Sequence, residues 1–323
     1  MNPTSALVEL LETYHDLHSN WVERFDQPPS PVEFLQIIRR NRPVIISNGF
    51  SHWPAVEKWD SSYLKDKITG DITIAQTPFG NADSVVKNNE DGVEYFVKPH
   101  TTQGSFAEFL DHLQNDTRES SDPVQYAQSQ DDNLHGEYST LLSDIDEEIP
   151  WASVLGTPDA INLWIGNGRS TSALHKDNYE NLYCVLSGLK SFVLISPLEV
   201  ACVRERTLPS ATYKADADGG FKIVPDDPPS DVSCWPTLDP DNPEKTSPFW
   251  DLCKPLRVDV HPGEILYLPA MWYHKVSQKC APGSMCIAVN YWYDMDHSGP
   301  FYSLCQFVRS SSLLLANGPT FTY

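Results

Sequence analysis

The sequence lacks the features that would place the chain in a membrane or in an oxidising compartment. It has no apolar run near the roughly 20 residues that span a bilayer, and one of the longest, Met285–Val289, is far shorter. The amino terminus has no basic segment followed by an apolar one, so no secretory signal is expected. The seven cysteines are an odd number without a Cys-x-x-Cys pair, which indicates reduced thiols. We therefore expect a protein of the cytoplasm or nucleus without membrane contact.

Positive charge is also scarce. The 323 residues include 23 Lys and Arg against 44 Asp and Glu, which gives a formal charge of −21 and a pI near 4.7. This balance opposes binding to a phosphate backbone and favours a basic partner, so nucleic acid is not an expected substrate. Residues 119–150 contain nine acids and no Lys or Arg. That run is typical of a solvated loop, and a guide for a cationic substrate is the alternative.

Four segments carry helix signals. Ser30 can cap a helix that runs to about Arg40, because proline and Glu33 follow in the capping-box order. Ser105 has the same relation to Glu108 and predicts a helix ending near Asn115. Residues 301–315 have apolar spacing that suits a helix, either in the core or at a dimer face. A further helical stripe is formed near the amino terminus by Leu7, Leu10, Leu11, Tyr14, Leu17 and Trp21.

Most other apolar residues fall in short β-branched and aromatic runs, which indicate a barrel or sandwich with few helices. A chain of this length fits one elaborated core. Residues 197–255 contain ten prolines and eight aspartates and predict a long insertion of the kind that often forms a lid. The runs are Val44–Ser47, Ile72–Thr77, Val124–Gln128, Ala160–Ile165, Leu182–Leu186, Phe192–Ile195, Arg257–Val260, Ile265–Leu268 and Met285–Trp292.

Two histidines and one aspartate form a candidate metal site. His175 and Asp177 lie two apart, so on a strand they would share one face and could chelate one ion. His274 follows a turn and an alternating pattern that places it on a half-buried strand. Taken singly, each histidine is equally consistent with a surface or core residue. Together they form the two-histidine, one-carboxylate triad that holds Fe(II) and leaves positions open for oxygen activation, whereas structural zinc more often uses cysteines.

A lysine lies fifteen residues beyond the first candidate ligand. Lys190 leads into the apolar run Phe192–Ile195, where a buried ammonium is costly unless an anion pairs with it. A keto-acid cosubstrate that chelates iron would present such an anion at its far carboxylate. A surface lysine is the alternative interpretation.

At this point the sequence resembles the JmjC oxygenases. The resemblance extends over nearly the whole chain, from Asn41–Ile46 to Ala288–Asp294. It rests on ordered motifs at 52–55, 150–153, Leu174–Asp177, Tyr179–Tyr183, Pro262–Ala270, Trp272–His274 and 288–294.

This resemblance implies a mainly β fold, the double-stranded β-helix or cupin-like jelly roll, with flanking helices and a C-terminal helical element. We expect an N-terminal part at 1–120, a core at 121–296 that includes the insertion, and a dimerisation element at 297–323. The resemblance assigns His175, Asp177 and His274 to Fe(II), and Lys190 to the distal carboxylate of 2-oxoglutarate. Tyr126, Asn181 and Asn290 match polar positions of the cosubstrate pocket. Ser172 stands where relatives often have threonine, and Thr171 beside it is a second candidate for that hydroxyl.

The implied activity uses 2-oxoglutarate and O2 to oxidise a C–H bond of a protein. The resemblance favours lysyl hydroxylation, with a translation-associated GTPase of the developmentally regulated GTP-binding class as the target and a homodimer as the assembly. Lysine demethylation is the alternative, and the absence of zinc-finger cysteine clusters makes it less attractive. A non-catalytic cupin-fold binding protein and a zinc cupin are further alternatives.

Overall fold

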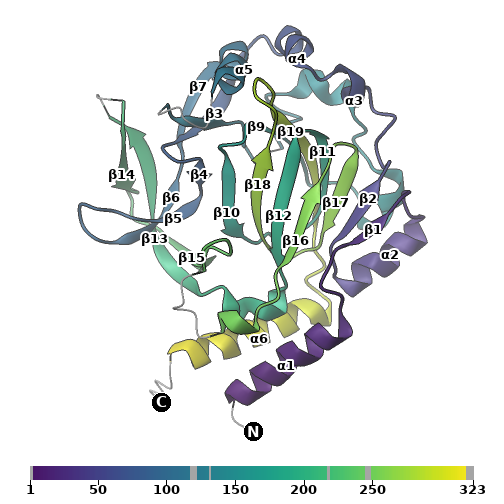
Figure 1. The fold of residues 1–323 in the computed structure, drawn as a ribbon, viewed down its shortest axis with the longest axis vertical. Helices are drawn as coiled ribbons and strands as arrows, with labels where there is room; N and C mark the ends of the chain where they lie inside the picture. Colours follow the sequence, from purple (N-terminus) through teal and green to yellow (C-terminus); the bar gives the residue numbers. More distant parts are fainter. Residues whose placement is uncertain (1–2, 117–121, 131, 217–218, 244–248, 318–323) are drawn as a thin grey trace.

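A computed structural model describes residues 3–116, 122–130, 132–216, 219–243 and 249–317 (Figure 1). Strands dominate the middle of the molecule, and the helices lie around them. The helices nearest the two termini, α1 (Pro3–Leu17) and α6 (Pro300–Asn317), lie beside each other below the sheets.

The largest sheet has six strands. Its pairs are antiparallel except for the edge pair β1–β2, which is parallel. β1 and β2 come from the first 50 residues, so the N-terminal part of the chain completes this sheet. In order across the sheet, the strands are β1 (Glu23–Phe25), β2 (Val44–Ser47), β17 (Glu264–Leu268), β11 (Tyr179–Ser187), β19 (Cys286–Asp294) and β9 (Ala160–Gly166).

A second sheet carries most of the candidate site. Its central strands pair antiparallel, whereas the short edge strand β4 runs parallel to β10. In order across the sheet, the strands are β16 (Leu256–Val260), β12 (Leu189–Ile195), β18 (Tyr273–Lys279), β10 (Thr171–His175) and β4 (Asn81–Ala82).

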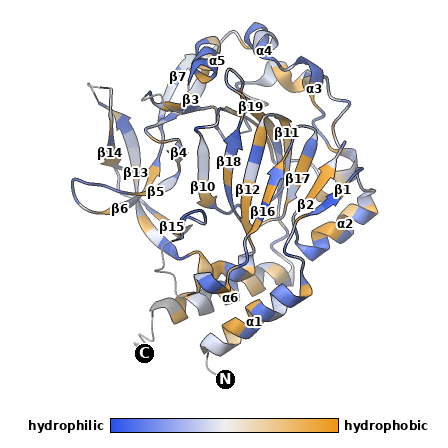
Figure 2. Cartoon of the chain, viewed as in Figure 1, coloured by the Kyte–Doolittle hydropathy of each residue, from blue (hydrophilic) through white to orange (hydrophobic). Residues whose placement is uncertain are grey.

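Alternation along the strands explains how the two sheets close on each other. On β11, Leu182 and Cys184 pack into a core cluster on the outer face of the six-stranded sheet, whereas Tyr183 and Val185 pack inward. Phe192 of β12 belongs to the same inner cluster, so the two sheets share one core. Both faces of the large sheet are thus covered, and its inner strands are mostly apolar, whereas the edge strand β1 is polar (Figure 2).

The segment predicted as an insertion folds onto the open side of the barrel. It forms β13 (Glu205–Ala215), β14 (Phe221–Pro225) and β15 (Asp231–Pro236), and β13 pairs with β6 (Glu94–Lys98), which pairs with β5 (Ser84–Lys87). These strands were not predicted from the sequence. A smaller sheet joins β7 (His100–Ser105), β3 (Asp71–Thr77) and β8 (Val124–Tyr126).

Helices cover the outer face of the six-stranded sheet. The predicted capping box of Ser30 and Glu33 is present, and the helix α2 (Pro31–Arg40) ends where expected. Ser105 accepts a hydrogen bond from the Glu108 amide at the start of α5 (Phe106–Asn115). The shorter helices and 3₁₀ turns are α3 (Pro54–Lys58), α4 (Ser61–Lys67), η1 (Ser139–Asp144), η2 (Pro150–Leu155), η3 (Pro197–Cys202) and η4 (Trp250–Leu252).

Two predictions about the N-terminal half need correction. The first helix stops at Leu17, so Trp21 is not part of its apolar stripe and is largely exposed. The acidic segment is not uniformly solvated, because Asp144 is buried and accepts hydrogen bonds from Trp59 Nε1 at 3.1 Å and Tyr63 Oη at 2.6 Å. The segment therefore contributes to the packing of the helices above the sheet.

The expected fold class is confirmed: a mainly β, cupin-like barrel with flanking helices and a helix near the carboxyl end. The seven cysteines all lie in the described part of the chain, and no disulfide joins any two of them. Among the described residues, none of the helices combines the length and apolar character needed to cross a membrane. The division into an N-terminal part, a core and a dimerisation element stays a prediction.

Candidate metal centre and the cavities beside it

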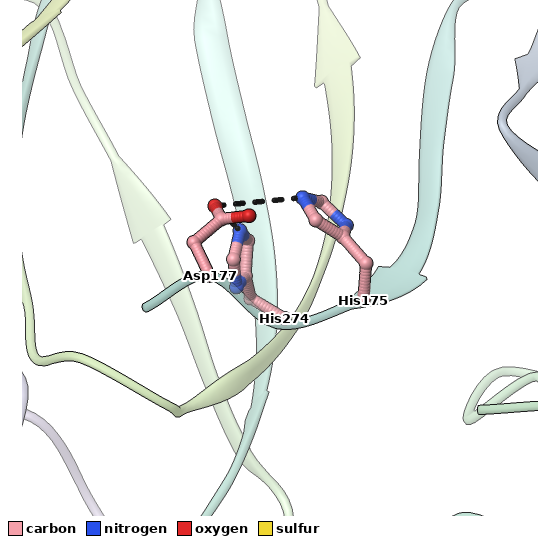
Figure 3. A group of neighbouring side chains, drawn as sticks. All are labelled: His175, Asp177 and His274. Carbon is pink, nitrogen blue, oxygen red and sulfur yellow. Dashed lines mark ion pairs between the residues drawn. The ribbon is translucent and has the colours of Figure 1, made fainter. Parts of the chain in front are cut away.

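The three candidate ligands converge at one end of the second sheet (Figure 3). His175 is the last residue of β10 and pairs with His274, the second residue of β18. Asp177 lies beyond the end of β10, so the expectation that His175 and Asp177 share the face of one strand is wrong in detail. The turn that follows β10 brings the carboxylate back to the imidazoles.

The donor atoms of the triad surround a common point. One nitrogen or oxygen from each side chain lies within 4.8 Å of the other two. Asp177 Oδ2 is 3.9 Å from His175 Nε2 and 3.6 Å from His274 Nε2. These separations are too long for hydrogen bonds, and they suit ligands that share an ion instead of bonding to each other.

The other ring nitrogen of each histidine is held by the backbone. His175 Nδ1 lies 2.7 Å from the Ala173 carbonyl, and His274 Nδ1 lies 3.0 Å from the Trp272 carbonyl. Each Nδ1 therefore carries the hydrogen and donates it, which leaves the Nε2 lone pair for a metal. Burial and the neighbouring His175 lower the pKa of His274 to about 4, so its imidazole stays neutral at physiological pH. Metal binding needs this neutral form.

The turn that carries Asp177 is fixed on both sides. The Met271 amide donates a hydrogen bond to the Asp177 carbonyl at 2.8 Å, and Met271 itself has a positive φ of 69°. The intervening Lys176 points to the buried Glu205, with Nζ and Oε1 2.6 Å apart. Glu205 belongs to β13, so the insertion helps to hold the metal-binding turn.

A small cavity lies behind the triad inside the barrel. His175, Asp177 and His274 line it together with polar and aromatic side chains of both sheets. Its other lining residues are Tyr126, Gln130, Trp164, Ser172, Asn181, Tyr183, Phe192, Val276, Asn290 and Trp292. The structure thus brings Tyr126, Ser172, Asn181 and Asn290 to the triad, although their roles in cosubstrate binding stay predictions.

Lys190 is completely buried beside this cavity. It shares the inward face of β12 with Phe192, and its ammonium donates hydrogen bonds to the Tyr126 hydroxyl at 3.2 Å and to Gln278 Oε1. Both partners are neutral, and the structure gives Lys190 no carboxylate partner among the described residues. Burial lowers the pKa of Lys190 to about 8. Tyr126, which accepts a hydrogen bond from the ammonium, also lines the cavity.

The remaining predicted polar residues are linked to one another. Asn290 donates to Asn181 Oδ1 at 3.2 Å and accepts from Trp164 Nε1 at 2.8 Å. Ser172 faces the cavity, whereas Thr171 lines a separate cavity on the other side of β10. Ser172 is therefore the residue whose hydroxyl is available to the site.

A glycine makes room for the partners of Lys190. A β-carbon at Gly166, the last residue of β9, would lie 2.4 Å from the Tyr126 ring and 2.6 Å from Gln278 Nε2. Both distances are too short, so any side chain at 166 would displace these two groups. Gln278 was missed by sequence reasoning, although it lies four residues after His274 on the same inward face of β18.

A wider cleft of about 760 Å³ opens from the triad to the surface. Residues of the insertion, including Thr212 and Trp235, form part of its wall. The Trp235 ring lies parallel to that of His175, with centroids 6.3 Å apart and planes 10° apart. Asp83, from the loop after β4, also lines the cleft. Neither Trp235 nor Asp83 was identified from the sequence, because no local pattern links them to the triad.

The donor set fits Fe(II) and a dicarboxylate cosubstrate. Two neutral imidazoles and one carboxylate are the ligands of the facial triad, and the cavity and cleft leave space on its open side. No cysteine joins this group within the described residues. A buried ammonium with only neutral partners fits the far carboxylate of 2-oxoglutarate. A zinc isomerase would leave this ammonium without an anion.

Comparison with known proteins points to the same chemistry. Residues 29–299 match the family described as Cupin-like domain. The chain is 38% identical over 310 residues to "Lysine-specific demethylase JMJ32" of Arabidopsis thaliana, covering 90% of this chain and 88% of the relative. It is 38% identical over 281 residues to "Bifunctional peptidase and (3S)-lysyl hydroxylase JMJD7" of Homo sapiens, covering 85% of each. "JmjC domain-containing protein E" of Dictyostelium discoideum is 31% identical over 339 residues, 94% of this chain and 96% of the relative.

Proposed function

The chain belongs to the cupin-like JmjC family of iron- and 2-oxoglutarate-dependent oxygenases, and from this premise we propose that it hydroxylates a lysine side chain of a protein. The convergence of the triad with Lys190 at one end of the barrel carries the oxygenase part of the proposal. The human relative, which is named as a lysyl hydroxylase, supports the reaction. The absence of a second metal-ligand group among the described residues argues against a zinc-finger demethylase architecture.

When bound, iron and 2-oxoglutarate supply the oxidising chemistry, in which decarboxylation of the cosubstrate to succinate by O2 is coupled to insertion of oxygen into a C–H bond. The protein binds and orients the metal and the cosubstrate. His175, Asp177 and His274 would hold the metal, and Lys190 would hold the far carboxylate of the cosubstrate. The Tyr126 hydroxyl accepts a hydrogen bond from Lys190 and would be free to donate its own hydrogen to the same carboxylate.

Other side chains position the cosubstrate and exclude water. Asn181, Asn290 and Ser172 offer hydrogen bonds around the small cavity. Phe192, Val276 and Trp292 supply its apolar walls, which keep the reacting atoms dry and fixed in orientation. The wider cleft then admits a side chain of the substrate to the open side of the triad.

The proposed substrate is a protein of basic character. The net charge of −21 favours encounter with a lysine-bearing partner and disfavours nucleic acid. From the sequence resemblance, we propose a translation-associated GTPase of the developmentally regulated GTP-binding class as the target. The cytoplasm or nucleus is the corresponding location.

Lysine demethylation is the second candidate, because the relative from Arabidopsis thaliana is named as a lysine-specific demethylase and is equally identical. The two reactions leave different products on the substrate. Incubation of the iron-loaded protein with 2-oxoglutarate and a candidate GTPase, followed by succinate measurement and peptide mass spectrometry, separates them. We expect one added oxygen on a lysine, stoichiometric with succinate.

Loss of a methyl group in that assay, in place of an added oxygen, would overturn the hydroxylase proposal. Absence of iron binding and of any 2-oxoglutarate turnover by the wild-type protein would instead support the non-catalytic alternative. A parallel incubation without O2 should give neither succinate nor modified peptide.

We propose that α6 mediates a homodimer. Leu304 and Phe307 are 48% and 68% exposed on this helix, and Leu314 extends the same apolar surface. Exposed large apolar side chains that gather on one helix are typical of protein interfaces. Phe307→Glu should convert a dimer into a monomer in light scattering, because burial of the carboxylate would be unfavourable.

Leu35→Glu on α2 is the matched control, since it introduces the same charge at another exposed apolar position. A Phe307→Glu protein with the mass of the wild-type assembly would contradict the proposed interface.

A further inference from the structure

We propose that Asp83 is the specificity-determining residue that binds the protonated ammonium of the substrate side chain in the cleft. The inference rests on the proposed lysyl hydroxylation and extends it by naming the group that recognises lysine. It follows from the position of Asp83, from the charges that line the cleft and from the aromatic walls around it.

The first observation is position. Asp83 directly follows β4, whose Asn81 and Ala82 pair in parallel with Thr171 and Ser172 of β10. β10 is the strand that ends at His175, so the pairing places Asp83 on the same cleft as the metal ligands. Asp83 has a positive φ of 52°, a backbone conformation that only a few residue types tolerate. Asp83 is one of the residues that form the wall of the cleft.

The second observation is the balance of charge along the cleft. Two lysines and two aspartates line it. Lys98 Nζ lies 2.7 Å from Asp226, whose carboxylate also accepts hydrogen bonds from Ser210 and Thr212. Burial raises the pKa of Asp226, but these three donors together lower it to about 2. Lys98 is thus paired with Asp226, and no ion pair within 4 Å joins it to Asp83 among the described residues.

The other lysine and the other aspartate that line the cleft also have partners. Lys176 is bound to Glu205, and Asp177 is directed at the two imidazoles of the triad. Asp83 is then the lining carboxylate that has neither a metal site nor an ion pair within 4 Å among the described residues. A cleft with a carboxylate that has no ion-pair partner within 4 Å attracts a cationic side chain.

The third observation is that the Asp83 carboxylate is only weakly hydrogen-bonded. Its hydrogen bond from Gln128 Nε2 is 3.5 Å long, at the limit of such contacts. Burial raises the pKa of Asp83, and the charge of Lys98 offsets this only in part. An incoming ammonium would replace the lost solvation with a charge-assisted hydrogen bond, which is a strong interaction at a partly buried site.

The fourth observation is the aromatic surface of the same cleft. Phe96, Trp164 and Trp235 line the same cleft, and Trp235 packs edge-on against Phe96 with centroids 4.5 Å apart. Such walls suit the four methylenes of a lysine stem, because long cationic side chains bury their stems and keep the charged end on a polar group. The combination of one carboxylate and aromatic walls matches lysine better than a neutral or acidic residue.

The simpler interpretation is that Asp83 only shapes the loop after β4. It predicts no preference for a cationic ligand, so binding measurements separate the two interpretations. The probes are two short capped peptides that are identical except for one position, which is lysine in one and norleucine in the other. The protein carries Mn(II) and 2-oxoglutarate, so the paramagnetic relaxation of side-chain protons reports proximity to the metal without turnover.

We expect the lysine side chain to relax faster and to bind more tightly than norleucine in the wild-type protein. Asp83→Asn keeps the size and removes the charge, and it should weaken lysine binding about 10-fold or more while leaving norleucine unchanged. Asp83→Gly is a second variant, because glycine accepts the positive φ and so preserves the loop. Asp66→Asn, an exposed position on α4, is the control for loss of one negative charge.

Equal binding of the two peptides to the wild-type protein would overturn the role of Asp83. A lysine preference that persists in both Asp83→Asn and Asp83→Gly would overturn it as well. Failure of the hydroxylase proposal has a different signature, because it appears in the mass of the modified substrate and not in this preference. The metal content of each variant, measured by atomic absorption, verifies that the triad is intact.

Discussion

Replacing His274 with alanine is expected to abolish iron binding and 2-oxoglutarate turnover. The variant retains only two of the three ligands, and the alanine side chain in the buried position of the ring has no atom that can bind the metal. Outer hydrogen-bond partners of metal ligands alone contribute about 10- to 100-fold to metal affinity, so loss of a ligand should exceed that range. The measurements are iron content after anaerobic reconstitution and succinate release.

His261→Ala is the matched control for His274→Ala. His261 is exposed in the turn before β17 and lies outside the triad. Its variant should bind iron and release succinate like the wild-type protein. Iron bound by the His274→Ala protein with wild-type affinity would contradict the assignment of this side chain as a ligand.

The second large effect is expected for Lys190→Met, which should lose affinity for 2-oxoglutarate. Truncation of one partner of a buried, hydrogen-bonded charge pair costs about 2–5 kcal/mol, or roughly 30-fold and more in affinity. Methionine keeps most of the volume, so packing against Phe192 and Tyr126 is retained. Titration of the iron-loaded protein with 2-oxoglutarate under anaerobic conditions measures the change in affinity.

The same substitution should not destabilise the protein without cosubstrate. A fully buried ammonium with neutral partners carries a desolvation cost that a methionine lacks. Thermal unfolding should therefore show a Lys190→Met protein at least as stable as wild type, and only the wild-type protein should gain stability on addition of 2-oxoglutarate. Lys214→Met, at an exposed position of β13, is the control and should retain cosubstrate affinity. A destabilised Lys190→Met protein with normal affinity would contradict the assignment.

The lowered pKa of Lys190 also predicts a pH dependence. Because burial lowers this pKa from 10.5 to about 8 in the folded protein, the unfolded chain binds more protons between these two values. Stability attributable to this lysine is therefore constant below pH 8 and rises as the pH increases from 8 towards 10.5. The difference in unfolding free energy between wild type and Lys190→Met isolates this contribution, and a difference that does not change with pH would contradict it.

Local patterns predicted the elements that local chemistry determines. The helix α2 begins after the predicted capping residue Ser30 and ends at Arg40, as predicted. The strand β2 coincides with its predicted run of β-branched residues. The insertion strands were missed because their alternation is broken: β13 contains a proline and an irregular register with β15. Trp21 was misplaced because an apolar spacing continued past the point where the helix gives way to β1.

The triad and Lys190 could be proposed from the sequence because their motifs are short and ordered. The residues that line the cleft could not be proposed in this way. Asp83 reaches the site through the parallel pairing of β4 with β10, two strands about 90 residues apart whose pairing leaves no periodic trace. Trp235 lies on β15, and the pairing of β15 with β13 places its ring beside that of His175. Contacts of this kind depend on tertiary topology, so residues that select the substrate were harder to find than residues that bind the metal.

Position 166 tolerates no side chain, although it supplies no metal ligand itself. Alanine is ordinarily the mildest replacement for glycine in a strand, yet here one added carbon would push the tyrosine and the glutamine that hold the buried ammonium. We therefore expect a substitution at 166 to weaken the binding of 2-oxoglutarate, although the metal ligands, the fold and the substrate-binding surface would be unaltered.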